Sequence, residues 1–203
     1  MTPSPQDPRL PFSEACERNK EPILAAIRPL LAGAKAVLEI GSGTGQHAVH
    51  FAASLPHLRW HASDRPPALP GLAARLHQAA SPNLHGPLSL DVGQPDWPAL
   101  DVDTIFSANS LQIMSPSEAA LLFVGAQALL PVGGQLIIYG PFNRDGHFTS
   151  PGNVHLDAWI RRSHPAGGIK DLEAVLALAE GFALQANLTM PANNHLLHWL
   201  KPG

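Results

Sequence analysis

The sequence AVLEIGSGTGQHAVHFAAS, residues 36–54, joins three local patterns in one short stretch. Its first five residues are apolar apart from Glu39, as in a buried strand that ends at a turn. Three glycines then alternate with Ser42 and Thr44, and apolar residues return at helical spacing from Ala48 onward. A strand, a glycine turn and a helix in this order predict the first unit of a parallel α/β sheet.

Strands and helices alternate along the rest of the chain. Runs of β-forming residues predict further strands at 58–63, 84–90, 102–108 and 135–139. Helical spacing predicts helices at 13–31, 72–80, 115–130 and 171–179. Ser115 and Glu118 form a capping box around Pro116, which favours a helix start there. Asp171 is expected to cap the last of these helices.

Two more strands, 182–190 and 195–200, are separated only by the residues 191–194. This link is too short for a parallel crossover, so the two strands should pair as an antiparallel hairpin. We therefore predict an α/β, Rossmann-like fold, with a seven-stranded, mostly parallel sheet, a C-terminal antiparallel hairpin and helices on both faces. Residues 13–203 should form one domain, and the proline-rich residues 1–12 a flexible N-terminal tail.

Composition argues against several classes of partner. The formal net charge is −3, from 13 basic and 16 acidic residues, and no run of Lys or Arg suggests binding to nucleic acid. No apolar stretch reaches the ~18 residues of a membrane-spanning helix. The single cysteine, Cys16, cannot form an internal disulfide, and the first residues lack the pattern of a secretion signal. We therefore expect a cytoplasmic protein with no membrane partner.

The glycine turn predicts a nucleotide-like ligand, because glycines let backbone N–H groups approach a ligand closely. A dinucleotide fingerprint would need glycine or alanine at the sixth position from Gly41, where this chain has Gln46. A triphosphate loop would need a lysine, which the turn lacks. Asp64 follows Gly45 by 19 residues, near the spacing at which an acid accepts hydrogen bonds from ribose hydroxyls. The alternatives are a turn without a ligand and Asp64 as a cap before Pro66-Pro67.

Two more polar residues stand at the ends of predicted strands. Asp91 closes the third strand, and Asn109 closes the fourth. Ligands bind at the carboxyl ends of the strands in open α/β sheets. We therefore expect both side chains at the edge that carries the glycine turn, although either could instead cap a loop.

The segment from Val37 to Gly45 resembles the first motif of class I S-adenosyl-L-methionine (SAM)-dependent methyltransferases, followed in order by Asp64, Asp91-Val92 and residues 103–109. The Pro131-Val132-Gly133-Gly134 turn is similar to that fold as well. More narrowly, residues 13–200 resemble the methyltransferase-like family called domain of unknown function 938. The segments that carry this resemblance are ACERNKEPIL at 15–24, GQHAVHF at 45–51, YGPF at 139–142 and MPANN at 190–194. The resemblance implies the class I methyltransferase fold and SAM as cofactor, but no substrate.

The resemblance also implies roles for individual residues. In class I relatives, the acid at the place of Glu39 and the turn residues serve the methionine end of the cofactor; the turn residues here are Gly41, Ser42, Gly43, Thr44 and Gly45. The acid matching Asp64 serves the ribose, and the pair matching Asp91-Val92 serves the adenine. The segment 109–112, NSLQ, departs from the Asn/Asp-Pro-Pro-Tyr/Phe element of enzymes that methylate amino groups of adenine or glutamine. Those substrates are therefore disfavoured.

The first predicted helix carries further candidates for cofactor contacts. Arg18 could pair with the cofactor carboxylate, and Asn19 could bond its ammonium or the substrate, which would make the helix a lid. The alternative is a solvated face formed by residues 18–20. His47 falls in the first turn of the next helix, beside the ligand. No metal is expected, because the 11 histidines and one cysteine form no metal-binding motif.

Four residues are candidates for catalysis: Asn109, Tyr139, His147 and His155. The methyl group of a sulfonium is already activated, so alignment and exclusion of water can suffice and a general base is optional. The segment 143–165 is long for a loop and contains apolar anchors, which predicts an ordered cover over the substrate. Phe142 and Phe148 should wall the acceptor pocket. The alternative is a packing insertion at the sheet edge.

These observations together predict a SAM-dependent methyltransferase that acts on a small-molecule substrate. Two alternatives belong to other classes. The first is a catalytically silent module of the same fold that binds the cofactor or a partner. The second is an NAD-dependent oxidoreductase, which Gln46 disfavours.

Overall fold

The computed structural model describes residues 10–203, so the predicted tail lies outside the described residues except for its last three positions. The helices and strands follow one another in this order: α1 (Glu14–Leu30), β1 (Ala36–Ile40), α2 (Gln46–Ser54), β2 (Arg59–Asp64), η1 (Pro66–Ala68), α3 (Leu69–Ala79), β3 (Leu84–Ser89), β4 (Thr104–Ala108), α4 (Pro116–Leu129), β5 (Gln135–Pro141), α5 (Pro151–Ser163), α6 (Leu172–Leu178), β6 (Ala183–Met190), η2 (Pro191–Asn193) and β7 (Asn194–Leu200).

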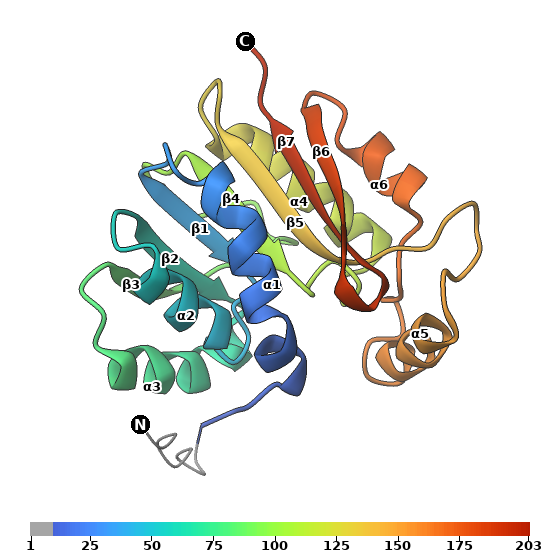
Figure 1. Ribbon diagram of the computed structural model, residues 1–203, viewed down its shortest axis with the longest axis horizontal. Helices are drawn as coiled ribbons and strands as arrows, with labels where there is room; N and C mark the ends of the chain where they lie inside the picture. The colour runs from blue at the N-terminus through green and yellow to red at the C-terminus, as the bar shows by residue number, and fades with distance from the viewer. Residues whose placement is uncertain (1–9) are drawn as a thin grey trace.

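The seven strands form one sheet in the order β3-β2-β1-β4-β5-β7-β6. The first five strands pair in parallel, and β7 is antiparallel to both β5 and β6. The predicted sheet and its C-terminal hairpin are therefore confirmed. The carboxyl ends of the parallel strands meet at the lower edge of the sheet in Figure 1. The strand order reverses between β1 and β4, and such a switch point is where ligands bind in this type of sheet.

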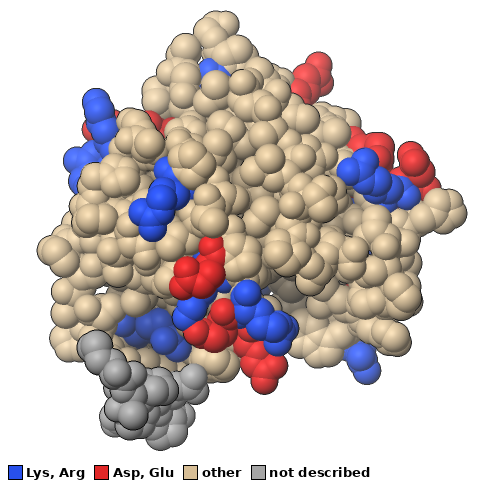
Figure 2. Space-filling view, in the orientation of Figure 1, with Lys and Arg blue, Asp and Glu red and all other residues tan. Residues whose placement is uncertain are grey.

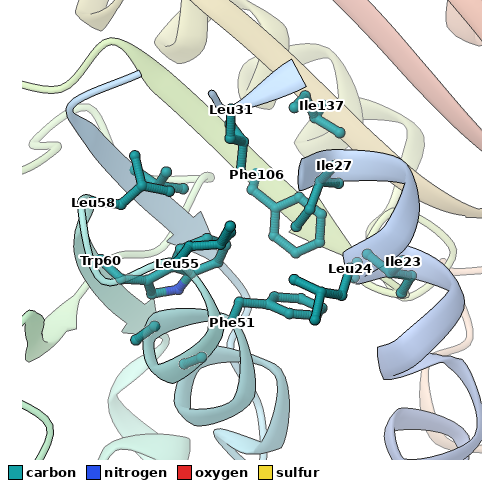
Figure 3. Packing of buried hydrophobic residues seen from close by; sticks show 14 of the residues in the cluster. Ile23, Leu24, Ile27, Leu31, Phe51, Leu55, Leu58, Trp60, Phe106 and Ile137 are labelled. Atoms are coloured by element: carbon teal, nitrogen blue, oxygen red, sulfur yellow. The ribbon is translucent and has the colours of Figure 1, made fainter. Parts of the chain in front are cut away.

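Helices cover both faces of the sheet and bury a hydrophobic core on each (Figure 1). The helices α1, α2 and α3 pack on one face, and α4 and α6 on the other. Figure 3 shows Phe51 of α2 between Trp60 of β2 and Phe106 of β4, with Leu24 of α1 beside it. All three aromatic side chains are fully buried. Burial of such a side chain contributes about 1.5–3 kcal/mol, so this core fixes α1 and α2 on the sheet.

Local sequence signals explain where several helices begin. Ser115 accepts a hydrogen bond from the Glu118 N–H (3.2 Å), and the Glu118 carboxylate accepts one from the Ser115 N–H (2.7 Å), which confirms the predicted capping box. Ser13 accepts a hydrogen bond from the Cys16 N–H (3.3 Å) at the start of α1. Asp171 occupies the N-cap position of α6, but its side chain makes no capping hydrogen bond, so that part of the expectation is wrong.

Helix α5 lies within the segment 143–165, where we expected an ordered cover formed by a long loop. Ser150 caps the helix through the Asn153 N–H (3.1 Å), and Pro151 is its first residue. The buried residues of α5 are Asn153, Asp157 and Ile160. Because two of these three are polar, the apolar spacing that normally identifies a helix is absent from the sequence.

Candidate active site

A cavity of about 300 Å³ opens at the carboxyl edge of the sheet, beside the switch point. The glycine turn, the segments that follow β2, β3 and β4, and the first turn of α1 form its walls. The lining residues are 13, 15, 16, 40–44, 47, 64, 65, 90, 92, 108–110, 113, 114 and 118. Cavities of about 300–1,000 Å³ are typical of small-molecule sites. This is the place that the sheet topology favours for a ligand.

The glycine turn has a backbone that other residues would adopt only under strain. Gly41, Gly43 and Gly45 all have positive φ angles, of 74°, 54° and 74°. A Cβ atom at Gly41 would lie 2.3 Å from the Ser110 hydroxyl oxygen, and one at Gly45 would lie 2.8 Å from Leu72. The turn therefore needs glycine for its conformation at all three positions and for close packing at two of them.

Asp64, at the end of β2, lines the cavity and holds the glycine turn. Its Oδ2 accepts a hydrogen bond from the Gly43 N–H (2.6 Å), and its Oδ1 accepts one from the Arg65 N–H (2.7 Å). The carboxylate is thus a cap for two backbone turns. Each carboxylate oxygen can accept a second hydrogen bond, so this capping leaves capacity for a ligand.

Glu39 lies behind the turn and does not line the cavity. Its Oε2 accepts hydrogen bonds from the Ser42 hydroxyl (2.9 Å) and from the Trp60 indole N–H (3.0 Å). Burial raises the pKa of Glu39 to about 7, and the negative charge of Asp64 adds to this rise. In the described structure Glu39 supports the turn through Ser42.

The two residues that close β3 and β4 are placed differently. Asn109 lines the cavity with a φ of 55°, and its Nδ2 is buried without a hydrogen-bond partner among the described residues. Val92 also lines the cavity, but Asp91 does not, and its carboxylate accepts a hydrogen bond from the Gly93 N–H (2.9 Å). Asp91 thus caps a loop, the alternative that the sequence left open. Asn109 thus lines the cavity and has a buried amide donor that no described residue satisfies.

The start of α1 covers one side of the cavity. The residues predicted to contact the cofactor here, Arg18 and Asn19 of α1 and His47 of α2, differ in their position relative to the cavity. His47 lines the cavity and contacts Asn19 of α1 (His47 Nε2 to Asn19 Oδ1, 2.7 Å). Burial lowers the pKa of His47 to about 4, so this imidazole is neutral at physiological pH. Arg18 is exposed and pairs with Glu14 (3.2 Å) on the same helix. His47 therefore lines the cavity and Asn19 contacts His47 without lining the cavity itself, while Arg18 is not among the lining residues.

Three of the four catalytic candidates do not line the cavity; only Asn109 does. Tyr139 is buried in the core beneath α1, and burial raises its pKa. His147 and His155 are exposed. These three residues thus lack the access to a cavity-bound acceptor that a general base needs.

The two phenylalanines that we expected to wall the acceptor pocket lie elsewhere, so that expectation is wrong. Phe142 is buried in the core on the α4 face of the sheet, where it packs on His195. Phe148 is exposed and borders a separate, shallow concavity at the start of α5. The cavity walls contain no residue from 143–165.

Several residues of the site had no signal that we used in the sequence. Cys16 and Ser13 line the cavity from α1, Ile113 and Met114 line it from the segment after β4, and Arg65 lines it beside Asp64. Cys16 lies in the segment 15–24 that carries the family resemblance, but the resemblance assigns it no role, and the other four belong to no motif. Ser13 and Cys16 are more than 20 residues from the glycine turn in sequence, so only the packing of α1 on α2 brings them there.

Charged residues gather on the outside of α1 as well as at Asp64, Arg65 and Glu118 in the cavity lining. Figure 2 shows Lys, Arg, Asp and Glu mixed over the lower part of this helix. They include the pairs Arg18–Glu14 and Lys20–Glu17, so neither sign dominates. Within residues 10–203, no group of three or more His, Cys, Asp or Glu side chains could hold a metal ion. The same residues include no helix long and apolar enough to cross a membrane.

Comparison with solved structures shows the fold. The chain is similar to an O-methyltransferase family protein from Burkholderia thailandensis (TM-score 0.82, 15% identity, covering 93% of this chain and 58% of that one). It is also similar to PigF, solved with S-adenosylhomocysteine, SAH (TM-score 0.80, 19% identity, covering 91% of this chain and 56% of that one). A third similar structure is human N-acetylserotonin methyltransferase in complex with SAM (TM-score 0.79, 14% identity, covering 94% of this chain and 53% of that one). The chain thus spans little more than half the length of these proteins.

These similarities confirm the predicted class I methyltransferase, Rossmann-like fold, since nearly the whole chain takes part in each of them. At such low identities they show the fold alone. A family model described as "Protein of unknown function (DUF938)" matches residues 10–201. The chain therefore belongs to the DUF938 family of proteins of unknown function.

Proposed function

We propose that this protein is a SAM-dependent methyltransferase that acts on a small molecule. One observation carries the proposal: the glycine turn, Asp64 and the unpartnered amide of Asn109 share a single cavity at the switch point of the sheet. The solved structures with SAH and SAM support it, because they have the same fold. Function has to be argued from the site, and this site has the features that a nucleoside ligand requires.

The residues present in the cavity fit this cofactor. Leu90, Val92, Ile113 and Met114 form an apolar wall that suits a planar base. Asp64 would accept hydrogen bonds from the ribose, and the glycine turn would lie against the methionine end. The buried Nδ2 of Asn109 would find an acceptor there, which would remove the cost of about 1–3 kcal/mol for an unsatisfied buried donor.

When bound, the cofactor supplies a methyl group that is already activated by its sulfonium. The chain then has to hold the acceptor in line with this methyl group and to exclude water. The start of α1 would exclude water, since Ser13, Ala15 and Cys16 close one side of the cavity. His47 would orient groups as a neutral donor or acceptor, because burial lowers its pKa to about 4.

Calorimetry with S-adenosylhomocysteine (SAH) and with NAD tests the cofactor assignment. We expect SAH to bind with micromolar affinity or better, roughly −8 kcal/mol, because a buried adenosine with several directed hydrogen bonds can reach this value. NAD should bind much more weakly, since Gln46 stands where a dinucleotide fingerprint has glycine or alanine. NAD binding as tight as SAH binding would rule out the proposal.

A silent cofactor-binding module is the second candidate, favoured by one observation. Tyr139, His147 and His155 do not line the cavity, so its walls contain none of these three candidate bases. Turnover separates the two functions. Release of SAH from SAM in the presence of a fractionated small-molecule extract supports the enzyme. Tight SAM binding with no turnover on any fraction supports the module.

A further inference from the structure

Helix α1 is attached to the protein in two different ways along its length. Its buried residues are Ile23, Leu24 and Ile27, all in the second half. These side chains pack against Phe51 and the sheet, as Figure 3 shows. The first half, residues 14–21, has no buried side chain, so hydrogen bonds rather than apolar packing attach it to the protein.

Pro22 lies at the boundary between the two halves. Proline has no N–H, so the carbonyl of Arg18 lacks its usual helical donor, and the ring crowds that same carbonyl. Helices bend preferentially at such positions. The first half of α1 can therefore move about Pro22 without disturbing the apolar packing of the second half.

Gln46 holds this movable half against the glycine turn. It is the first residue of α2, and its side chain is only 7% exposed. Its Oε1 accepts hydrogen bonds from the Ser13 N–H (2.6 Å) and from the Thr44 hydroxyl (3.0 Å). Its Nε2 donates to the Glu17 carboxylate (3.1 Å), a charge-assisted bond. One side chain thus joins the N-cap of α1, its first turn and the glycine turn.

The segment that Gln46 holds is also a wall of the cavity. Ser13, Ala15 and Cys16 line the cavity from α1, opposite the segment that follows β4. Two other contacts assist at either side: Asn19 contacts His47 (2.7 Å), and Arg75 donates to the Pro11 carbonyl (2.5 Å). Access to the cavity from this side requires these contacts to open.

We infer that Gln46 is a positioning residue that latches Ser13 and the first half of α1, residues 14–21, over the cofactor cavity, and that this half opens about Pro22 to admit and release the cofactor. The inference rests on the proposed function for the identity of the ligand. The hinge at Pro22 and the latch at Gln46 do not depend on the identity of the ligand. Gln46, which stands where a dinucleotide fingerprint has glycine or alanine, therefore gains a role in how fast the proposed cofactor leaves.

Gln46→Ala is the direct test, with Gln78→Ala as its matched control. The substitution Gln78→Ala makes the same chemical change at an exposed position of α3, and Gln78 does not line the cavity. Hydrogen–deuterium exchange of the free protein should become faster in residues 14–21 of Gln46→Ala and stay unchanged in residues 23–30. Stopped-flow release of SAH should be about tenfold faster. The variant loses two or three hydrogen bonds, each of which changes an equilibrium constant by roughly two- to tenfold, and bonds to water replace part of them. The control should match the wild type in both measurements.

Exchanging the side chains of Gln46 and Glu17 should rescue the SAH release rate, which a merely structural role of Gln46 would not predict. Gln46→Glu puts a second carboxylate against Glu17, so it should release SAH at least as fast as Gln46→Ala. Adding Glu17→Gln restores a donor and an acceptor with their places reversed. The double variant should return to within about twofold of the wild-type release rate, because the same hydrogen bond is formed again.

The outcomes separate this inference from the proposed function. Equal SAH release by the wild type and Gln46→Ala, or unchanged exchange in residues 14–21, overturns the latch. Faster exchange that extends through residues 23–30, with a lower melting temperature, overturns it as well, because the helix is then unfolding rather than opening. If the wild type binds no SAH, the proposed function fails and the role in cofactor release fails with it. The exchange data then decide on the hinge and latch by themselves.

Discussion

The side chain of Asp64 can cap two backbone turns and still accept hydrogen bonds from a ligand. Both of its oxygens already accept backbone N–H groups, from Gly43 and Arg65. These bonds hold the turn in shape and leave acceptor capacity toward the cavity. The two interpretations of Asp64 that the sequence allowed are therefore compatible in one geometry.

We expect Asp64→Ala to weaken SAH binding by about 1–3 kcal/mol, because it removes a charged acceptor and frees the Gly43 N–H. Isothermal titration calorimetry measures the loss. Asp64→Asn is the control, since it keeps one acceptor oxygen and should lose less. An unchanged dissociation constant in Asp64→Ala would make this residue a turn cap alone.

The residues of the site that could be predicted from sequence are those next to the strand ends. Asp64, Val92 and Asn109 stand at fixed distances from predicted strands, and the structure places all three in the cavity. Cys16 could not be predicted in the same way, because its place depends on the packing of a helix far along the chain. Arg18 pairs with Glu14 and does not line the cavity, and sequence spacing does not tell which face of α1 meets α2.

At the scale of elements, α5 and the segment after it brace a wall of the cavity. Asp157 of α5 accepts hydrogen bonds from the Ile169 N–H (2.7 Å) and from Arg161 (2.7 Å). The next residues reach the segment that follows β4. Gly168 donates to the Gln112 carbonyl (2.8 Å), and Lys170 donates to the Met114 carbonyl. Met114 lines the cavity, so α5 supports the site from outside.

We expect Asp157→Ala to lower the free energy of unfolding by about 2 kcal/mol, because it leaves the buried Ile169 N–H without a partner. Chemical denaturation followed by far-ultraviolet circular dichroism gives this value. Asp157→Asn should lose about half as much, since its amide oxygen can still accept that hydrogen bond. Equal stability of all three proteins would show that the bond to Ile169 contributes nothing.

The elements that could be predicted have a clear local signal. The strands β1, β4 and β5 are short, mostly buried runs of β-forming residues, and α4 begins with a capping box. Their order along the chain was confirmed. Helix α5 was missed because Asn153 and Asp157 occupy its buried face, where polar partners satisfy them. Its Ser150-Pro151 start was the one local signal present, and it resembles the Ser115-Pro116 start of α4.

For the molecule as a whole, two buried groups near the glycine turn link stability to pH. Burial raises the pKa of Glu39 from 4.5 to about 7, even though Trp60 and Ser42 donate hydrogen bonds to it. Burial, together with repulsion from the charge of His50, lowers the pKa of His47 from 6.5 to about 4. Unfolding exposes both groups and returns them to their ordinary pKa values.

The two contributions have opposite signs. Between about pH 4.5 and 7 the folded protein holds the Glu39 proton more tightly than the unfolded chain does, so rising pH lowers the free energy of unfolding by up to about 3 kcal/mol. Between about pH 4 and 6.5 the unfolded chain holds the His47 proton more tightly. Falling pH therefore lowers the free energy of unfolding by a similar amount.

Glu39→Gln isolates the first contribution, because glutamine has the same shape and keeps an oxygen for the Ser42 hydroxyl and the Trp60 N–H. His47 is present in both proteins, so its contribution cancels in their difference. We expect the free energy of unfolding of the variant, relative to the wild type, to rise by up to about 3 kcal/mol between pH 4.5 and about pH 8. Urea denaturation across this range measures it, and equal denaturant slopes confirm that the same surface is exposed in both. A difference that does not change with pH would mean that Glu39 ionises normally in the folded protein, with enough water around it to support the charge.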